Sequence, residues 1–227
     1  MSSPVRVIGA GAIDVRGVVG SFLEPFEFEA SGPAGVRWKD VFSLPNPSFR
    51  RLDLFGKCVC LCAEAAGAGR LLDEKQRKNT ALVLASRFGC LHSDLRFAGS
   101  LAPGERVEPA VFPYTLPSTC LGELAIRHRF QGPLLALVST SAGEGPALFE
   151  AQELVATGEA AAALVCIGDC LPEEEAARIG LEPRLALTTL LLTGQESGSP
   201  TLLDWTRVRE AADPLGVVSA ALWGDER

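Results

Sequence analysis

A short run of small residues has the residue types and the position of a catalytic turn. Ser139-Thr140-Ser141-Ala142-Gly143 follows the apolar run from Leu134 to Val138 and precedes a segment with helical periodicity. A side chain on such a strand-to-helix turn can lie at the helix N-terminus, where backbone N–H groups stabilise a developing negative charge. This geometry suits acyl transfer. Ser141 lies at the apex of the predicted turn, with Ala142 and Gly143 as candidate acyl-site or oxyanion-site residues.

A serine nucleophile needs a base, and the sequence contains only two histidines. His128 lies between two arginines near the end of a predicted helix, where we expect it to be solvated. His92 lies in a predicted loop after a strand, and nothing in its position pairs it with Ser141. The turn also departs from the G-x-S-x-G pattern, because Ser139 replaces the first glycine. Ser141 is therefore either an acyl nucleophile or a small residue that fits a tight turn.

Two other patterns suggest cofactors, and we favour a simpler interpretation of each. Cys58, Cys60 and Cys62 alternate as in a soft-metal site, but neither histidine has metal-ligand spacing to them. We predict that they are small buried hydrophobic residues and that the chain binds no metal. The segment GAGAID near residue 9 resembles a dinucleotide-binding turn, but its third glycine is missing and no helix is predicted after it. We expect no cofactor.

Composition excludes several classes of protein. The chain has 227 residues, 47% of them hydrophobic and 22% charged, which is typical of a globular protein. The net charge is -7 and no basic run occurs, so we expect no nucleic-acid partner. Mean hydropathy is high at +0.20, but no apolar run reaches 18 residues, so we expect no membrane span. The N-terminus lacks the pattern of a signal peptide, which predicts a cytoplasmic protein whose apolar excess lies in a subunit interface.

Apolar runs alternate with segments of helical periodicity along the chain. Predicted strands cover 5–8, 80–84, 134–138, 161–167 and 185–192, and predicted helices cover 49–66, 120–130, 145–157, 172–179 and part of 202–223. We predict a turn at Gly9-Ala10-Gly11, a loop after residue 84 and a short extended segment at 111–114. Runs such as LLALV and ALVCI are typical of strands buried on both faces. The sequence therefore predicts one α/β domain over residues 1–227, with a mixed, mostly parallel sheet of about five strands and helices on both faces.

Several of these segments, in this order, resemble the N-terminal half of β-ketoacyl synthases in the thiolase-like superfamily. The matching features are listed here in chain order: Val5 to Gly11, Arg51 to Lys57, Pro113 to Gly122, Gly132-Pro133, Ala147, Ala151, Gly158-Glu159-Ala160 and Gly168. Counted from Gly132-Pro133, the family's nucleophilic cysteine falls on Ser141. The resemblance covers about residues 4 to 195, and the family's two active-site histidines belong to a second half that this sequence does not reach.

The resemblance implies a half-length, non-catalytic protein similar to the chain-length-factor subunits that pair with an active ketosynthase. It implies a role in fatty acid, polyketide or aryl-polyene type biosynthesis, as a homodimer or in a heterodimer with a ketosynthase, with acyl carrier protein as a further possible partner. In the family, the strand before the nucleophile pairs across the dimer axis. That strand supplies the interface candidates Leu134, Leu135, Ala136, Leu137 and Val138. The alternative is a serine-dependent acyltransferase or thioester hydrolase that uses Ser141.

Three charged groups admit both a functional and a simpler interpretation. The cluster of Arg127, His128 and Arg129, with Arg50 and Arg51, is either a contact for an acidic carrier protein or a solvated helix face, and we favour the solvated face. We expect the acidic run from Glu173 to Glu175 to be a solvated first turn of a helix. We expect Asp53 to form a local ion pair or a helix cap rather than to act as a catalytic acid.

Overall fold

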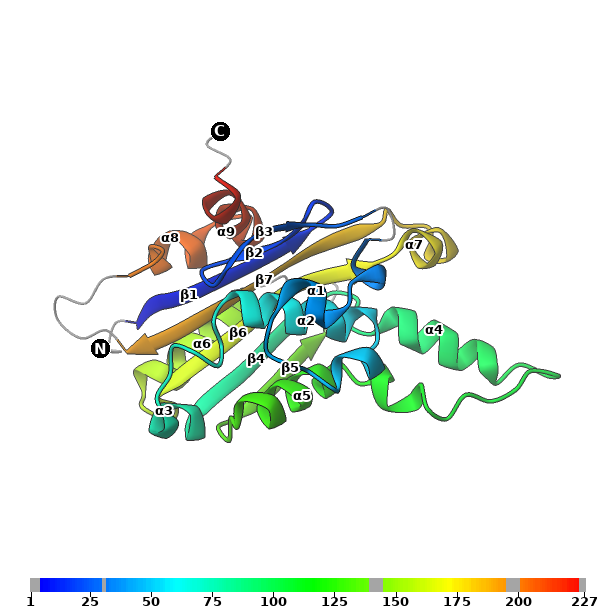
Figure 1. Cartoon of the computed structure of the whole chain (residues 1–227), viewed down its shortest axis with the longest axis horizontal. Coiled ribbons are helices and arrows are strands. Elements are labelled where there is room, and N and C mark those ends of the chain that lie inside the picture. Colours follow the sequence, from blue (N-terminus) through cyan, green and yellow to red (C-terminus); the bar gives the residue numbers. More distant parts are fainter. Residues whose placement is uncertain (1–4, 30–31, 139–144, 195–200, 225–227) are drawn as a thin grey trace.

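The computed structural model describes residues 5–29, 32–138, 145–194 and 201–224, and Ser141, Ala142 and Gly143 lie outside them. The described part of the chain forms a seven-stranded sheet in the order β3-β2-β1-β7-β6-β4-β5. Its strands are β1 (Val5–Asp14), β2 (Gly17–Gly20), β3 (Leu23–Glu27), β4 (Thr80–Ser86), β5 (Leu134–Val138), β6 (Ala162–Leu171) and β7 (Arg184–Gly194). Figure 1 shows this sheet crossing the molecule. The predicted α/β class is confirmed.

The strand count and the strand directions differ from the prediction. Only β4–β5 and β4–β6 are parallel pairs, and the four other pairs are antiparallel, so the sheet is not mostly parallel. The two additional strands, β2 and β3, come from a segment whose glycines and proline hid its strand character. β1 and β2 are joined by two residues, Val15 and Arg16, and such a short connection allows only antiparallel pairing.

The glycines near the N-terminus lie inside β1, so the predicted turn at Gly9-Ala10-Gly11 is wrong. β1 continues through them to Asp14. A Cβ atom on Gly9 would overlap the carbonyl oxygen of Ala66, and one on Gly11 would overlap the carbonyl oxygen of Cys62. These glycines therefore allow a helix to lie directly on the strand, and they do not reverse the chain.

Helices cover both faces of the sheet, as predicted. One face packs against α2 (Leu54–Ala65) and α5 (Ser118–His128), which lie in front of the sheet in Figure 1. The opposite face packs against α6 (Gly145–Ala156), α8 (Trp205–Glu210) and α9 (Pro214–Trp223). The described side chains form two hydrophobic clusters, one on each face. No helix in the described ranges is long and apolar enough to cross a membrane.

Several short helices connect these elements. They are η1 (Gly32–Gly35), α1 (Trp38–Val41), η2 (Phe49–Arg51), α3 (Glu74–Lys78), α4 (Leu91–Ser100), η3 (Phe112–Thr115) and α7 (Glu173–Ile179). α4 occupies a segment predicted as loop, and η3 replaces the extended segment predicted at 111–114. In α4 only Ser93 and Ser100 are buried, although Leu91, Leu95 and Ala98 recur at helical spacing, so the helix adds little to the hydrophobic core.

Candidate functional site

β5 is a free edge of the sheet. The prediction of a buried strand at 134–138 is correct for the strand and wrong for its burial. Among the residues that the structure describes, β5 pairs only with β4, and its side chains are exposed or half-buried, with Leu134 45% and Val138 50% exposed. The strand is entirely apolar and carries neither a charge nor a proline. An exposed apolar edge strand of this kind is a template for pairing with another chain.

The register of β5 shows which of its backbone groups are unpaired. Leu82 on β4 is opposite Leu134, and its N–H donates to the carbonyl oxygen of Pro133 at 2.8 Å. In a parallel ladder, a residue on one strand bonds to the two neighbours of its opposite residue. The backbone groups of Leu134, Ala136 and Val138 therefore face away from β4. The free edge thus presents three sets of N–H and C=O groups.

The other edge strand, β3, is protected by its sequence. It reads LEPFE, with a proline in its centre and glutamates at two positions. Proline and charge on an edge strand both prevent pairing with a further strand. This contrast singles out β5 as the unprotected edge of the described sheet.

The predicted nucleophile segment connects β5 to α6. The structure describes Val138 on one side of it and Gly145 on the other, so the predicted order of strand, turn and helix is confirmed for the strand and the helix. The β4–α4 loop lies beside the end of β5, because a Cβ on Gly89 would lie 2.9 Å from Cγ of Pro117 and 3.3 Å from Cγ2 of Val138. The loop that leads to His92 therefore contacts the residue directly before the segment.

A buried carboxylate, Asp169, holds this loop. Asp169 is fully buried at the carboxyl end of β6, and its Oδ1 accepts hydrogen bonds from Ser86 Oγ at 2.8 Å and from the N–H of Arg87 at 2.7 Å. The N–H of Phe88 donates to the same oxygen at 3.3 Å. Nε of Arg184 lies 3.6 Å from Oδ2, and this positive charge offsets part of the desolvation cost of the carboxylate. Asp169 thereby ties the ends of β4 and β6 together.

Two further polar contacts surround the start of α4. His92 Nδ1 and Glu175 Oε1 are 2.6 Å apart, with Glu175 buried and the imidazole half-buried. Ser93 Oγ donates to Asp53 Oδ2 at 3.0 Å, and Oδ1 of Asp53 accepts from the N–H of Gly56. Asp53 is the N-cap of α2, which agrees with the predicted helix cap. The expectation that Glu175 is solvated is wrong, because α7 packs its first turn against His92.

Burial is the main cause of the pKa shifts of the groups near the start of α4. It raises the pKa of Asp53, and the hydrogen bonds from Gly56 and Ser93 oppose that change only in part. It also raises the pKa of Asp94, and the negative charge of Asp53 adds to the effect. Burial, followed by the charge of Asp53, raises the pKa of the Cys90 thiol well above neutral pH. Cys90 therefore stays protonated at neutral pH.

In the basic cluster, Arg50, Arg51 and Arg129 are exposed, as expected for a solvated face, whereas Arg127 and His128 have structural contacts. His128 is only 7% exposed, so the prediction of a solvated side chain is wrong. Burial lowers its pKa to about 4, although the charge of Glu64 opposes the shift, and the imidazole is neutral at pH 7. Arg127 Nε donates to Glu64 Oε1 at 2.5 Å, and its guanidinium lies over the ring of Trp38. These contacts join α5 to α2 and leave Arg127 unavailable as a free contact for a carrier protein.

All seven cysteines are buried with free thiols, as the hydrophobic interpretation predicts. Cys58, Cys60 and Cys62 lie along α2, where it packs on the sheet. Burial raises the pKa of Cys60 and Cys62, and in Cys58 the neighbouring Cys170 is the largest cause of the increase. Among the described residues, no group of three His, Cys, Asp or Glu side chains could hold a metal ion.

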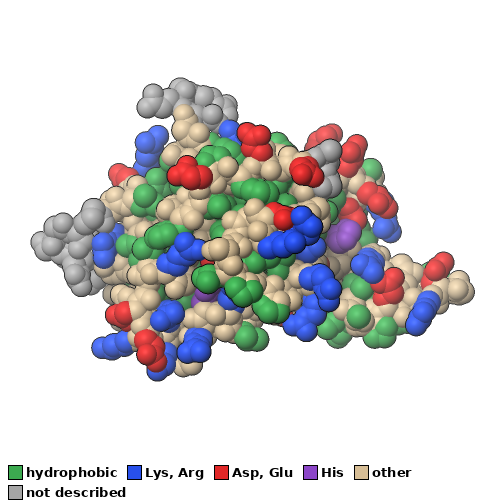
Figure 2. Space-filling view, viewed as in Figure 1, with side chains coloured by type: hydrophobic (Ala, Val, Ile, Leu, Met, Phe, Trp, Pro, Cys, Tyr) green, Lys and Arg blue, Asp and Glu red, His purple; other side chains and the backbone are tan. Residues whose placement is uncertain are grey.

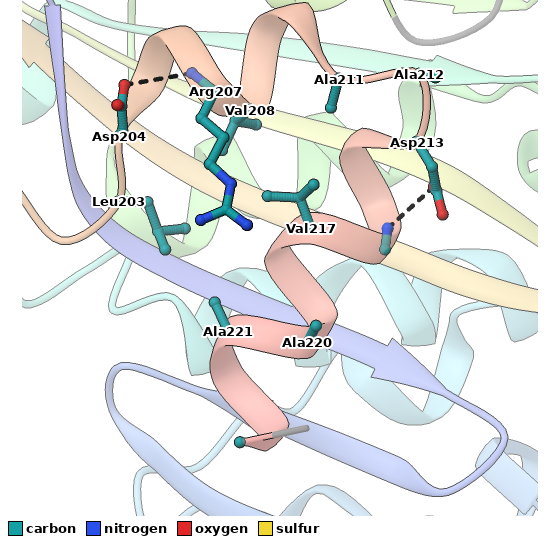
Figure 3. Close-up of a pocket in the computed structure, with 12 residues that line it drawn as sticks. Leu203, Asp204, Arg207, Val208, Ala211, Ala212, Asp213, Val217, Ala220 and Ala221 are labelled. Atoms are coloured by element: carbon teal, nitrogen blue, oxygen red, sulfur yellow. Dashed lines mark hydrogen bonds between the residues drawn. The ribbon is translucent and has the colours of Figure 1, made fainter. Parts of the chain in front are cut away.

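An open groove of about 960 Å³ lies between α8 and α9. Figure 3 shows Arg207 extending across it toward Val217, with Asp204 and Asp213 near its rim. Asp204 caps α8 by accepting from the N–H of Thr206, and Asp213 caps α9 by accepting from the N–H of Gly216. Both carboxylates are therefore engaged with backbone groups. The groove lining contains neither a nucleophile nor a histidine.

The apolar run at 134–138 predicted the β5 strand. The polar groups that surround the end of this strand were not predicted. Asp169 follows an apolar run, and Glu175 belongs to the acidic first turn of a helix. Both patterns are common on protein surfaces. Their partners, Ser86 and His92, lie 83 residues away in each case. Only the pairing of β4 with β6 brings these residues together. A carboxylate directly after a buried strand was the one available signal for Asp169.

Comparison with known proteins identifies the family. The family model described as "Beta-ketoacyl synthase, N-terminal domain" matches residues 29–213. A search of curated proteins found no match. Solved structures do match, and one is described as the ishigamide ketosynthase/chain length factor, with a TM-score of 0.65 and 17% identity. That match covers 87% of this chain and 63% of the other, so the chain spans less than two thirds of that protein.

Two further structures have the same fold. One comes from a complex of the ketosynthase ApeO with its chain length factor ApeC from Xenorhabdus doucetiae, with a TM-score of 0.59, 16% identity, and coverage of 87% of this chain and 81% of the other. The other comes from a type II polyketide synthase carrier protein in complex with its ketosynthase, with a TM-score of 0.56, 15% identity, and coverage of 86% and 64%. Because the family model spans most of the chain and the folds agree, this chain belongs to the β-ketoacyl synthase N-terminal domain family.

Proposed function

We propose that this chain is a non-catalytic ketosynthase-like subunit of the chain-length-factor type, and that it acts by pairing with a ketosynthase through β5. The observation that carries the proposal is the unprotected edge of β5, which lies directly before the position of the family nucleophile. Apolar side chains and three outward-facing sets of backbone groups meet there. The partner that fits this edge is a second strand with an apolar face.

The nucleophile position supports a non-catalytic role. The family's cysteine is replaced by Ser141, and serine has no useful anion at neutral pH without an adjacent base. All seven cysteines are buried elsewhere in the fold, and burial keeps Cys90 protonated. The buried histidine, His128, packs between α2 and α5, on the face of the sheet opposite α6. We propose that the chain functions as one domain over residues 1–227.

A solved complex supports pairing with a different subunit. The chain that matches in the ketosynthase–chain length factor complex shares its fold with this one over 87% of this chain and 81% of its own length. A subunit with this fold in such a complex is a fitting precedent for the proposed role in polyketide, aryl-polyene or fatty acid type biosynthesis. A homodimer through β5 is the other assembly consistent with the free edge, because a two-fold axis can pair a strand with its own copy.

The test is the mass of the particle in solution. The full chain is measured by size-exclusion chromatography with light scattering, alone and mixed with ketosynthases encoded in the same genome, at micromolar concentration. We expect a one-to-one complex with a ketosynthase. A chain that stays monomeric alone and in every mixture contradicts the proposal. A carrier protein added to the complex then tests the second expected partner.

A second candidate function, serine-dependent acyl transfer, is favoured by one specific observation. His92 is hydrogen-bonded to buried Glu175, and its loop contacts Val138 directly before the segment that contains Ser141. A carboxylate that orients an imidazole is the arrangement of a general base. Intact mass spectrometry after incubation with acyl thioesters tests this function. An acyl adduct that disappears in Ser141→Ala and slows in His92→Gln supports it, and the absence of any adduct eliminates it.

A further inference from the structure

A helical extension projects from the body of the protein next to the β5 edge. It comprises α4, the loop that follows it and η3, and we call residues 91–117 the α4–η3 arm. Figure 1 shows the arm reaching away from one end of the sheet. Four of its large apolar side chains are between 48% and 57% exposed, and they are Leu101, Val107, Phe112 and Leu116. An ordinary surface loop does not hold so many large apolar side chains in water.

The shape of the arm is fixed by contacts within the arm. Arg96 Nε donates to Glu108 Oε2 at 2.9 Å, across the loop that joins α4 to η3. The rings of Phe97 and Phe112 pack with their centroids 5.4 Å apart. Ser100 Oγ accepts from the N–H of Glu108 at 3.2 Å. These contacts hold the arm in one conformation before any partner binds, which lowers the entropic cost of binding.

The base of the arm is attached to the body by polar contacts. His92 bonds to Glu175 on α7, and Ser93 bonds to Asp53 at the start of α2. The end of the arm lies near the end of β5, because Pro117 and Val138 both approach Gly89. The last residue of the arm is therefore close to the end of the free edge. Figure 2 shows hydrophobic side chains along the arm and over neighbouring α5.

We propose that the α4–η3 arm is the surface that selects the partner subunit. This inference rests on the proposed function, because its partner is the ketosynthase that pairs with β5. Backbone pairing at an edge strand is nearly independent of sequence, so β5 alone would also accept a second copy or an unrelated strand. Selection requires side chains that fit one surface and not another. The arm supplies four exposed large apolar side chains near the end of the edge, and its Arg96 and Glu108 are paired with each other, so the fitting surface on the ketosynthase is an apolar one.

The test separates the arm from β5. The double variant Leu101→Asp with Leu116→Asp places two charges on the arm without touching the Phe97–Phe112 packing. Leu202→Asp is the matched control, since Leu202 is also an exposed leucine but lies outside the arm. We expect the double variant to bind the ketosynthase at least about tenfold more weakly, while Leu202→Asp binds like the parent chain and all three proteins melt at the same temperature.

A second measurement tests the role of the arm without using variants. Hydroxyl-radical footprinting of the parent chain compares side-chain oxidation in the free protein and in the complex. We expect Leu101 and Phe112 to be protected in the complex. The proposed role of the arm is overturned if the complex forms while both residues remain fully oxidised and the double variant binds with undiminished affinity. The proposed pairing through β5 is unaffected by that result. If the parent chain forms no complex, both the proposed function and the proposed role of the arm are overturned.

Discussion

Replacing Ala136 with proline tests the pairing of β5 at a single atom. The backbone N–H of Ala136 faces the free edge, whereas the β4–β5 ladder bonds come from the residues on either side of it. Proline removes that N–H and adds a ring on the partner's side. The ladder to β4 keeps all its hydrogen bonds, so the fold should tolerate proline at this edge position. We therefore expect the isolated variant to melt close to the parent chain.

The expected loss of affinity follows from one missing hydrogen bond. The partner's carbonyl group is left buried without a donor, which costs about 1–3 kcal/mol. That cost corresponds to a dissociation constant about 5 to 150 times larger. Titration by biolayer interferometry with the ketosynthase immobilised measures this constant. Ala136→Val is the control, because it keeps the N–H and should bind within about threefold of the parent chain.

An Ala136→Pro variant that melts normally and binds with the parent affinity would refute the assignment of β5 as the interface. Should the proline variant fail to fold, Leu134→Lys replaces it, because Leu134 is 45% exposed whereas Ala136 packs against the hydrophobic cluster on the α2 and α5 face. Lysine keeps every backbone group and places a charge on the edge, a device by which natural edge strands avoid pairing. Undiminished binding by a folded lysine variant would refute the same assignment.

Three predictions concern the elements that position this edge. Asp169→Asn should lower the free energy of unfolding by about 1–3 kcal/mol in urea titration, because a neutral amide oxygen is a weaker acceptor for the three hydrogen bonds that Oδ1 receives, and the amide NH2 group would replace Oδ2 beside the Arg184 guanidinium; an unchanged midpoint would contradict this role. Gly11→Ala should destabilise the protein by about 3 kcal/mol or more, since its Cβ would overlap the carbonyl oxygen of Cys62, while Gly122→Ala on α5 meets nothing and should be neutral or stabilising. His128 has a pKa lowered to about 4 in the folded state, so the unfolded state binds its proton first and stability is lost as pH falls from about 6.5 toward 4. His128→Gln should flatten thermal stability over that pH range, and an equally steep curve for the variant would count against the shifted pKa.

Elements with a strong local pattern could be predicted from the sequence. α2 has apolar residues at three- and four-residue spacing and a capping aspartate, and the structure places it from Leu54 to Ala65. β4 and β6 each contain an apolar run, and both strands are buried along their whole length. In these segments, propensity, patterning and tertiary packing favour the same structure, so local reasoning is sufficient.

Features that depend on distant contacts could not be predicted in this way. Gly9 and Gly11 are glycine because α2 lies on β1, about 50 residues later in the chain, and a turn is the ordinary local explanation of such a pair. His128 has charged neighbours in the sequence but is buried against Glu64 of another helix. In the α4–η3 arm, Leu91, Leu95 and Ala98 recur at helical spacing, but the run is short and is followed by a segment rich in glycine and proline, which favours a loop. Its shape follows from contacts that periodicity does not register.

The most direct test of pairing through β5 is residue-resolved amide hydrogen exchange by NMR on the full chain, free and bound to the ketosynthase. The ladder register predicts an alternating result. The amides of Leu134, Ala136 and Val138 should exchange much more slowly in the complex, while those of Leu135 and Leu137, already bonded to β4, should change little. A stable complex in which the three outward-facing amides exchange as fast as in the free chain would contradict the pairing of β5.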